Sequence, residues 1–400
     1  MKIILAVTGS ISAYKALDIC RGLSKSGHEV RVIVSKGACE FLNPKAFHYL
    51  GAKNVYSFND DFNLEQYESD TKVLHIDLVK WCDRVLISPA SANTIAKLAG
   101  GFCDDLISSV FLALGDKPCL IFPAMNTNML THPMTQENLK KLSELKNVFI
   151  HPTKSGELAC GDVGAGKLSD VELIIEVTPI INISKPTKTI LITTGATMSA
   201  LDPVRYITNA STGITGYKFA KEYLRLGYKV ILIKGFNSTH EIDYLKDLPN
   251  IKIMEAATTA KMHELVLEHF DDCDYYISTA AMSDIEFDLS DSKLKKDKFN
   301  GQIPFHNAVD VLASVLDKKV KQKIVGFAAE SSSDSDTFIN KWKRKPVDLL
   351  IGNVVSSGAT SAKKGFGSNE NEYFFIKDAK IVETLSLSKD ELAKKILDSL

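Results

Sequence analysis

The 400-residue chain lacks several patterns that would assign it to common protein classes. Its seven cysteines occur singly, with no C-x-x-C pair, so neither a disulfide framework nor a structural zinc site is expected, and a reducing cytoplasm suits the chain. No apolar run approaches the roughly 20 residues that a membrane-spanning helix needs. The short apolar N-terminus, which ends at Gly9, is typical of a buried first strand rather than a signal peptide. The formal net charge of −1, without a basic block, gives no indication of a nucleic-acid or membrane-surface partner.

What is present is the composition of a globular protein with two or three domains. The chain is 45% hydrophobic and 24% charged, which supplies enough apolar material for two buried cores. Residues 2–7 and 189–194 are apolar strands that each lead into a glycine turn, so the chain begins the same kind of unit twice. The polar, proline-containing stretch 183–188 lies between them, and we expect domains at 1–184 and 187–400.

Apolar runs alternate with helical patterns in both halves, which predicts parallel sheets covered by helices on both faces. Strands are expected at 2–7, 30–34, 84–88 and 119–122, and then at 189–194, 229–233, 251–254, 275–278, 324–327 and 349–351. Helices are expected at 12–26, 74–81, 91–98, 104–114, 135–145, 217–226, 258–270 and 309–316. Residues 372–376 and 380–383 resemble a hairpin, followed by a last helix at 389–397. The predicted fold class is therefore α/β, with two doubly wound domains.

A glycine-rich segment, residues 156–168, surrounds Cys160 with four glycines. Because glycine disfavours both helices and strands, we expect a long loop that moves or folds over a ligand, with Cys160 facing it. A surface loop with an incidental thiol is the alternative, and the segment alone does not decide between the two.

In doubly wound sheets, ligands bind beyond the carboxyl ends of the strands, so the residues after each strand are candidates. In the first half these are G-S-I-S at 9–12, P-A-S-A-N-T at 89–94 and P-A-M-N at 123–126, all small or uncharged. They suit a flat polar ligand with a phosphate, such as a mononucleotide, although a serine N-cap would explain the first motif equally well. The G-x-G-x-x-G fingerprint is absent. His75 opens an expected helix, and a lone histidine is more often structural than catalytic.

Together with D-D-L at 104–106, Met129 and L-A-C-G at 158–161, these motifs resemble the flavin-dependent phosphopantothenoylcysteine decarboxylases over about residues 1–180. The resemblance implies a flavodoxin-like domain that binds FMN and forms a trimer with the site at subunit contacts. It further implies that Cys160 donates a proton to an enethiolate, that Asn126 binds the substrate carboxylate, and that His75 is an essential residue near the flavin. The FMN-binding residues that it implies are Gly9, Ser10, Ile11, Ser35, Ser88, Ala90, Ser91, Asn93, Thr94 and Met125.

The second half carries a different set of polar residues after its strands. Arg205 and Asn209 lie near an S-T-G turn at 211–213, which indicates phosphate and carboxylate binding, with a helix-capping loop as the alternative. Further candidate motifs occur at 280–284, 326–330 and 365–371. The lysine-rich run 293–296 would, by itself, usually be a solvated face.

This set resembles the phosphopantothenate–cysteine ligases over about residues 187–400. The resemblance implies a dimeric, Rossmann-like nucleotide-binding domain that uses CTP and Mg²⁺ to convert 4′-phosphopantothenate to an acyl-cytidylate, which cysteine then attacks. Asn209 is implied to process the acyl intermediate, and Lys293 to be the lysine of the family's catalytic run. The implied substrate and CTP residues are Arg205, Ala280, Ala281, Met282, Ser283, Asp284, Asp310, Phe327, Lys341 and Lys345. The metal ligands are unknown from the sequence.

Both resemblances together predict a bifunctional enzyme that couples cysteine to 4′-phosphopantothenate and then decarboxylates the product to 4′-phosphopantetheine. Ala196, Ser199 and Ile214 stand where the ligase motifs have glycine, glutamate and lysine, which leaves the nucleotide preference open. One alternative is a nicotinamide-dependent oxidoreductase, which the missing dinucleotide fingerprint disfavours. The other is a flavoprotein electron carrier, which would need neither a cysteine flap nor a second nucleotide-type domain.

Overall fold

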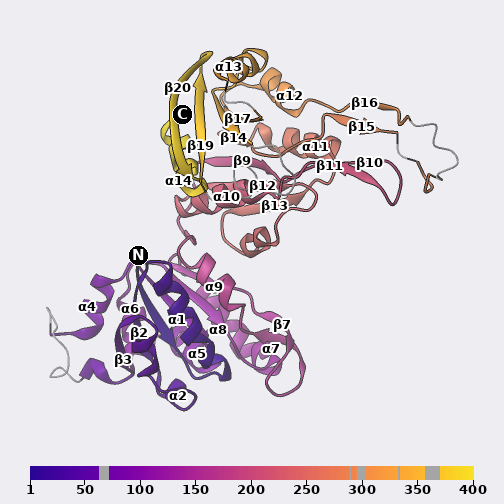
Figure 1. Ribbon diagram of the computed structural model, residues 1–400. Helices are drawn as coiled ribbons and strands as arrows, with labels where there is room; N and C mark the ends of the chain where they lie inside the picture. The colour runs from indigo at the N-terminus through magenta and orange to yellow at the C-terminus, as the bar shows by residue number, and fades with distance from the viewer. Residues whose placement is uncertain (63–71, 289, 295–301, 332–333, 356–369) are drawn as a thin grey trace. The chain divides into compact units, whose positions relative to one another are not determined.

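In the computed structural model the chain divides into two compact units, residues 1–184 with 247–249, and residues 185–246 with 250–400. The structure describes residues 1–62, 72–288, 290–294, 302–331, 334–355 and 370–400 (Figure 1). Each unit has its own parallel sheet and its own hydrophobic core, so each is described by itself. Within the described ranges, no helix is long and apolar enough to cross a membrane.

The first unit is built on a six-stranded parallel sheet in the order β3-β2-β1-β4-β5-β6. Its strands are β1 (Lys2–Val7), β2 (Glu29–Val34), β3 (Ala52–Ser57), β4 (Arg84–Ala90), β5 (Cys119–Pro123) and β6 (Val148–Ile150). All of β4 and all of β1 except Lys2 are buried, as expected for apolar strands covered on both faces. The order reverses between β1 and β4, which is where doubly wound sheets place their ligands.

Helices flank this sheet in two groups. The first group contains α1 (Lys15–Lys25), α3 (Ala46–Tyr49) and α9 (Val171–Val177). The second contains α4 (Leu74–Trp81), α5 (Ala92–Gly100), α6 (Leu106–Ala113), α7 (Thr127–Thr131) and α8 (Pro133–Ser143). Short helices η1 (Ile11–Tyr14), α2 (Lys36–Cys39) and η2 (Asp60–Phe62) complete the unit. The sequence patterns predicted α4 at its observed bounds, but they missed β3, β6, α7 and α9.

The expectation that the glycine-rich segment forms no strand was wrong. It belongs to an antiparallel hairpin of β7 (Lys154–Glu157) and β8 (Val163–Lys167), and Cys160 lies in the turn between them. The hairpin is held from outside, since the Met125 N–H donates to the Gly166 carbonyl at 3.0 Å. Gly166 has φ +114°, and a Cβ there would lie 2.2 Å from the Met125 carbonyl oxygen, so only glycine permits this approach.

The second unit is built on an eight-stranded sheet in the order β13-β12-β9-β14-β17-β18-β19-β20. Six strands are parallel: β9 (Thr189–Thr194), β12 (Lys229–Lys234), β13 (Ile251–Glu255), β14 (Tyr275–Ser278), β17 (Lys323–Glu330) and β18 (Leu349–Val354). They follow the same order as the first sheet, with the reversal between β9 and β14. The predicted hairpin is confirmed and is longer than expected, with β19 (Glu370–Lys377) and β20 (Lys380–Ser388) antiparallel at one edge.

The helices of the second unit are α10 (Ile214–Arg225), η3 (His240–Leu245), α11 (Thr259–Phe270), α12 (Val311–Lys318), α13 (Ser335–Arg344) and α14 (Lys389–Asp398). Two small ribbons, β10 (Met198–Ala200) with β11 (Tyr206–Thr208) and β15 (Ile285–Phe287) with β16 (Phe305–Asn307), project from the sheet side by side (Figure 1). The sequence patterns predicted neither ribbon, nor α13. Residues 295, 296 and 365–369 of the ligase-like motifs lie outside the described residues.

Candidate active sites

A cavity of about 600 Å³ opens at the carboxyl ends of β1, β4 and β5 in the first unit. Its position at the reversal of strand order is the one that doubly wound sheets use for ligands. The cavity is lined by Gly9, Ser10, Ile11, Ser12, Tyr14, Lys15, Ser91, Ala92, Ala124, Met125, Asn126, Met129, Glu157, Leu158, Ala159, Cys160, Gly166 and Lys167. All three predicted strand-end motifs and the turn of the cysteine hairpin therefore contribute to one space.

Thr8, which the sequence analysis did not select, joins two of these strand ends. Its hydroxyl donates to the Pro89 carbonyl at 2.7 Å and accepts from the Ser91 N–H at 2.8 Å, both inside the buried core. Ser91 in turn caps α5 by accepting from the Thr94 N–H at 3.3 Å. These bonds fix the backbone of both ligand-facing loops without placing any charge in the cavity.

The side chains of Asn126 and Cys160 contact each other on the wall of the cavity. The Asn126 Oδ1 accepts from the Asn128 N–H at 2.8 Å, which caps α7 and fixes the amide plane. The Asn126 Nδ2 consequently points the other way and donates to the Cys160 Sγ at 3.3 Å. The Cys160 thiol lies 3.3 Å from the Asp162 Oδ2, to which it donates. An amide donor and a thiol therefore meet at one point of the cavity wall.

The lining of this cavity fits FMN. Ser10 caps η1 by accepting from the Ser12 N–H at 3.4 Å, and η1 leads directly into α1, so the chain offers backbone donors and hydroxyls suited to a phosphate. Ile11 and Met125 supply apolar surface for a flat ring system. Five predicted FMN-binding residues line the cavity: Gly9, Ser10, Ile11, Ser91 and Met125.

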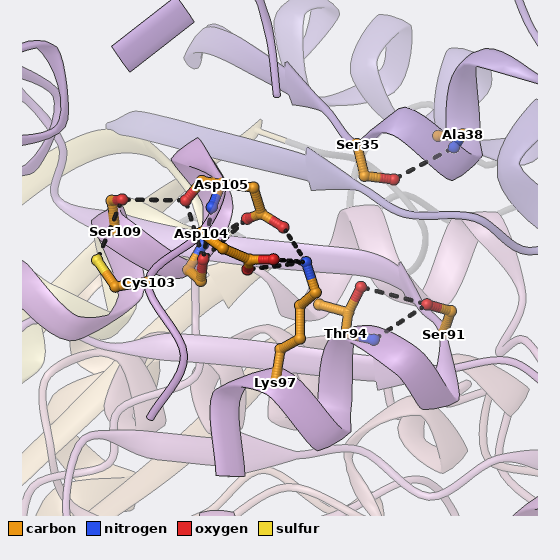
Figure 2. A network of polar contacts seen from close by, with 10 residues as sticks. Ser35, Ala38, Ser91, Thr94, Lys97, Cys103, Asp104, Asp105 and Ser109 are labelled. Atoms are coloured by element: carbon orange, nitrogen blue, oxygen red, sulfur yellow. Dashed lines mark hydrogen bonds and ion pairs between the residues drawn. The ribbon is translucent and has the colours of Figure 1, made fainter. Parts of the chain in front are cut away.

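The other five predicted FMN-binding residues do not line it. Ser88 and Ala90 are fully buried in β4, whereas Asn93 is exposed in the first turn of α5. Thr94 lies beneath Ser91, with their hydroxyl oxygens 3.2 Å apart (Figure 2). Ser35 caps α2 by accepting from the Ala38 N–H at 3.2 Å (Figure 2). Contact of these five residues with a cofactor stays a prediction.

The D-D-L motif at 104–106 does not line the cavity but holds the helix α5 that borders it. The Lys97 ammonium donates to Asp104 at 2.8 Å and to Asp105 at 3.0 Å, and Asp105 caps α6 through Ser108 (Figure 2). Burial by itself would raise the pKa of Asp105, but the hydrogen bonds from Ser108 and Lys97 bring that pKa below its ordinary value. The motif thereby ties α5, whose first residues face the cavity, to α6.

His75 lies at the start of α4 and is not part of the cavity lining. Its Nδ1 lies 2.8 Å from the Asp61 Oδ2, and its backbone N–H donates to the Asp61 Oδ1 at 3.1 Å. Asp61 therefore fixes both the helix start and the ring. The family resemblance places the active site where subunits meet, so the catalytic role of His75 stays a prediction about the assembled protein.

A second cavity, of about 440 Å³, lies at the carboxyl ends of the strands in the second unit. It is lined by Asn209, Ala210, Ser211, Thr212, Gly213, Ile214, Thr215, Thr279, Ala280, Ala281, Met282, Asp284, Phe327, Ala329, Lys341, Asn353, Asn371, Tyr373 and Lys389. Seven predicted site residues are in this group: Asn209, Ala280, Ala281, Met282, Asp284, Phe327 and Lys341. The side chain of Lys341 forms an ion pair with Glu330 at the end of β17.

A buried hydroxyl network holds the loop after β14 in place. Thr197 Oγ1 accepts from the Ser283 N–H at 2.7 Å and lies 2.8 Å from Thr259 Oγ1. Ser199, which stands where the ligase motif has glutamate, donates to the Ser283 hydroxyl at 3.0 Å. Ser283 thus positions the loop from behind rather than lining the cavity. Asn209, which lines the cavity, holds the same loop from the cavity side, since its Nδ2 donates to the carbonyls of Ala281 at 3.0 Å and Met282 at 3.1 Å.

Four predicted ligase residues lie outside this lining. Arg205 donates to the buried Asp202 carboxylate at 2.6 Å and to the Leu294 carbonyl at 2.8 Å, and its hydrogen bonds bring the pKa of Asp202 far below its usual range. Lys293, which precedes Leu294 in the chain, is exposed. Lys345 and Asp310 pair with each other at 2.6 Å. Contact of these four residues with a ligand stays a prediction.

The sequence analysis missed several lining residues, among them Asn353, Tyr373 and Lys389. Asn353 could have been found, because it follows the predicted strand 349–351 in the way that the other candidates follow theirs. Lys389 gave no such signal, since it reads as the first residue of a capped surface helix. Across the described ranges, no group of three or more His, Cys, Asp or Glu side chains could hold a metal ion.

The comparisons with known proteins agree with this two-site arrangement. The Flavoprotein family model matches residues 1–180, and the model of the DNA/pantothenate metabolism flavoprotein C-terminal domain matches residues 186–400. A coenzyme A biosynthesis bifunctional protein CoaBC of Bacillus subtilis is 35% identical over 405 residues, covering 100% of this chain and 96% of that protein. The protein of the same name from Vibrio vulnificus is 35% identical over 376 residues, covering 92% and 90%.

Among solved structures, a mutant PPC decarboxylase complexed with pantothenoylaminoethenethiol is 34% identical to this chain. The match covers 44% of this chain and 94% of that one, with a TM-score of 0.40.

Proposed function

The chain belongs to the family of coenzyme A biosynthesis bifunctional proteins, and from this we propose that its two cavities catalyse consecutive reactions. In the second unit, CTP activates the carboxylate of 4′-phosphopantothenate as an acyl-cytidylate, which cysteine attacks. In the first unit, the resulting 4′-phosphopantothenoylcysteine loses carbon dioxide to give 4′-phosphopantetheine, with FMN as the cofactor. No observation favours the electron carrier or the nicotinamide-dependent oxidoreductase.

The observation that carries the proposal is the convergence of Asn126 and Cys160 on one cavity wall. Their side-chain atoms are 3.3 Å apart, although the residues are 34 positions apart in the chain. An electron carrier would need neither an amide donor fixed by a helix cap nor a thiol aimed into the cofactor cavity. A decarboxylase of a cysteine-derived acid needs a donor for the carboxylate and a proton for the product carbon.

The side chains then divide the decarboxylation between them. The Asn126 Nδ2 donates to the substrate carboxylate and orients it, because its Oδ1 is already held by the Asn128 N–H. When bound, FMN supplies the two-electron acceptor that lets the substrate thiol be oxidised before carbon dioxide leaves and reduced afterwards. The Cys160 Sγ holds the proton that the decarboxylated carbon receives, and Asp162 lies within reach of that thiol.

The second cavity suits carboxylate activation. A carboxylate reacts with cysteine only when one of its oxygens becomes part of a leaving group, and cations must offset the charge of the triphosphate. Lys341 supplies a cation, and Asp284 supplies a carboxylate beside the cavity. Asn209 presents an amide at the loop 281–282, where the acyl group would be processed.

The remaining parts of the proposal concern the metal, the assembly and the location. We propose that Mg²⁺ enters with CTP, because magnesium in nucleotide sites is held largely by the phosphates and water rather than by a protein cage. Homo-oligomers based on a trimer of first units and a dimer of second units follow from the family resemblance. A cytoplasmic location suits the seven free cysteines.

A single assay tests both steps. The purified chain, loaded with FMN, is incubated with 4′-phosphopantothenate, cysteine, CTP and Mg²⁺, and the products are followed by mass spectrometry. We expect 4′-phosphopantetheine, CMP, pyrophosphate and carbon dioxide, and no turnover when CTP is omitted. A yellow protein that forms none of these products would refute both activities, whereas accumulation of 4′-phosphopantothenoylcysteine would refute the decarboxylase alone.

A further inference from the structure

The imidazole ring of His75 is held by both oxygens of one carboxylate, that of Asp61. The ring Nδ1 lies 2.9 Å from the Asp61 Oδ1 and 2.8 Å from the Asp61 Oδ2. The Asp61 side chain is only 7% exposed, whereas the His75 side chain is 26% exposed. The carboxylate is therefore enclosed by protein, and part of the ring stays open to solvent or to a ligand.

The carboxylate and the ring are positioned by different elements of the first unit. Asp61 lies in η2, just after the turn that follows β3. That turn is fixed, because the Ser57 N–H donates to the Asp60 Oδ2 at 2.7 Å and the Leu106 N–H donates to the Phe58 carbonyl at 2.9 Å. His75 comes from the first turn of α4, 14 positions later in the chain. Two separately anchored backbones thus bring the pair together.

A helix cap explains only one of the contacts that Asp61 makes. The N-cap residue of α4, Val73, forms no side-chain capping bond, and the Asp61 Oδ1 instead accepts from the His75 backbone N–H at 3.1 Å. A carboxylate there also suits the positive end of the helix dipole. This task needs no imidazole, since any residue at position 75 except proline offers the same N–H. The two contacts with the ring therefore require another explanation.

These contacts determine which ring nitrogen carries a proton. An aspartate carboxylate accepts hydrogen bonds and donates none, so the Nδ1 that faces Asp61 must carry a hydrogen. In a neutral ring the lone pair then lies on Nε2, and among the described residues none forms a hydrogen bond with that atom. A carboxylate that orients a histidine and selects its tautomer in this way is a recurring device of active sites.

We propose that Asp61 is a positioning residue for His75 in the decarboxylation. It keeps Nδ1 protonated and the ring fixed, so that Nε2 is presented as a proton acceptor. The inference rests on the decarboxylase function and on the role of His75 proposed above. It adds a residue that lies outside every motif on which the family resemblance depends.

The test is a double-mutant cycle on the full-length, FMN-loaded protein. Asp61→Asn keeps the helix cap, because asparagine caps as well as aspartate, but its amide can donate as well as accept and no longer selects the tautomer. We expect kcat for carbon dioxide release to fall about 10- to 100-fold, as for loss of a hydrogen bond to a charged group, with KM unchanged. Asp61→Glu, which keeps the carboxylate, should recover part of that loss.

The second arm of the cycle is His75→Gln. If Asp61 acts only through His75, the variant with both substitutions should be no slower than His75→Gln alone, whereas independent effects would multiply. Asp83→Asn is the matched control, since the Asp83 carboxylate accepts from the Lys2 N–H at 2.7 Å at the amino end of β1, away from the cavity. It should match the unmodified chain.

The outcomes separate a positioning role from a structural one. FMN content and denaturant unfolding are measured for every variant, and a loss of either in Asp61→Asn would show that Asp61 only supports the fold. Multiplying losses in the double variant, an unchanged kcat in Asp61→Asn, or full activity of His75→Gln would each overturn the proposal as well. If the unmodified chain releases no carbon dioxide from 4′-phosphopantothenoylcysteine, the decarboxylase function itself fails instead.

Discussion

Replacing Asn126 tests the first active site most sharply, because its amide performs two separable tasks. The Oδ1 caps α7 by accepting from the Asn128 N–H at 2.8 Å, and the Nδ2 donates into the cavity toward Cys160. Aspartate is as good a helix cap as asparagine, whereas alanine is not. Asn126→Asp should therefore keep the cap and lose the donor, and Asn126→Ala should lose both.

The expected magnitudes differ for the two tasks. Loss of a hydrogen bond to a charged carboxylate costs about 1.5 to 3 kcal/mol, so Asn126→Ala should lower the decarboxylase kcat/KM by about 10- to 150-fold. Asn126→Asp should lower it further, since two carboxylates about 4 Å apart near a protein surface repel each other by roughly 4 kcal/mol. Loss of the cap should cost Asn126→Ala about 1 kcal/mol in free energy of unfolding, and Asn126→Asp should lose almost none.

The assay measures carbon dioxide release from 4′-phosphopantothenoylcysteine and, separately, denaturant unfolding of the FMN-loaded protein. Asn128→Ala is the matched control, since Asn128 is exposed, does not line the cavity and contributes only its backbone N–H to the cap. The expected order of activity is the reverse of the order of stability: Asn126→Asp, which keeps native stability, is less active than Asn126→Ala. If activity instead follows stability, so that Asn126→Asp is the more active variant, Asn126 acts only as a helix cap.

Four further predictions follow from the two sites. Cys160→Ser should still release carbon dioxide but accumulate the oxidised decarboxylated product, because a hydroxyl is a far weaker acid than a thiol; mass spectrometry that finds full conversion to 4′-phosphopantetheine would remove Cys160 from the mechanism. The lowered pKa of Asp105 means that its ion pair with Lys97 stabilises the fold fully above about pH 4 and loses this effect as the pH falls through the folded-state pKa. Denaturant unfolding at pH 7 should thus separate Asp105→Asn from the unmodified protein, and at low pH the difference should shrink; a difference that grows in acid contradicts this sign. Lys293→Gln should slow CTP-dependent coupling and leave decarboxylation unchanged, whereas an unchanged coupling rate at saturating substrates would mark Lys293 as part of a solvated surface. Separate expression of residues 1–184 and 185–400 should give two folded pieces that each keep one activity, and an insoluble or inactive piece would show that the sites depend on each other.

The sequence was sufficient for the alternation of strands and helices and for most of the residues that face the two cavities. This follows from a general property of doubly wound sheets: the residue after a buried strand lies at the carboxyl edge, whatever the packing around it. The apolar runs that become β1, β4 and β5 could be recognised directly, so the motifs that follow them were placed at one edge before any contact was known.

The same reasoning failed where distant contacts decide the local structure. Strand propensities reflect side-chain packing, and they count glycine as unfavourable because it has nothing to pack. In the cysteine hairpin the contacts are made by the backbone of β8: the Met125 N–H donates to the Gly166 carbonyl, and the Thr127 hydroxyl donates to the Ala165 carbonyl at 2.6 Å. A Cβ on Gly164 would lie 2.4 Å from that hydroxyl, so the glycines that argued against a strand are what allow it to form.

The sequence did not predict that Lys389 lines the second cavity, for a related reason. A lysine after a serine and before an acidic residue is typical of an exposed helix start, and its local sequence contains nothing that indicates burial. Its environment arises because β20 returns the chain to the edge of the sheet and α14 then packs against α10, with the Tyr223 hydroxyl donating to the Ala393 carbonyl at 3.1 Å. Its burial therefore depends on contacts between segments about 170 residues apart, as in the pair of Tyr223 and Ala393.

The two units use the same device to hold a ligand loop at the point where the strand order reverses. In the first, Thr8 follows β1, and its hydroxyl accepts from the Ser91 N–H at 2.8 Å, just beyond the neighbouring strand β4. In the second, Thr197 follows β9, and its hydroxyl accepts from the Ser283 N–H at 2.7 Å, beyond the neighbouring strand β14. Each threonine is fully buried, so its bond is shielded from water and fixes the loop more firmly than an exposed contact could. A neutral hydroxyl achieves this without adding a charge of its own next to a bound anion.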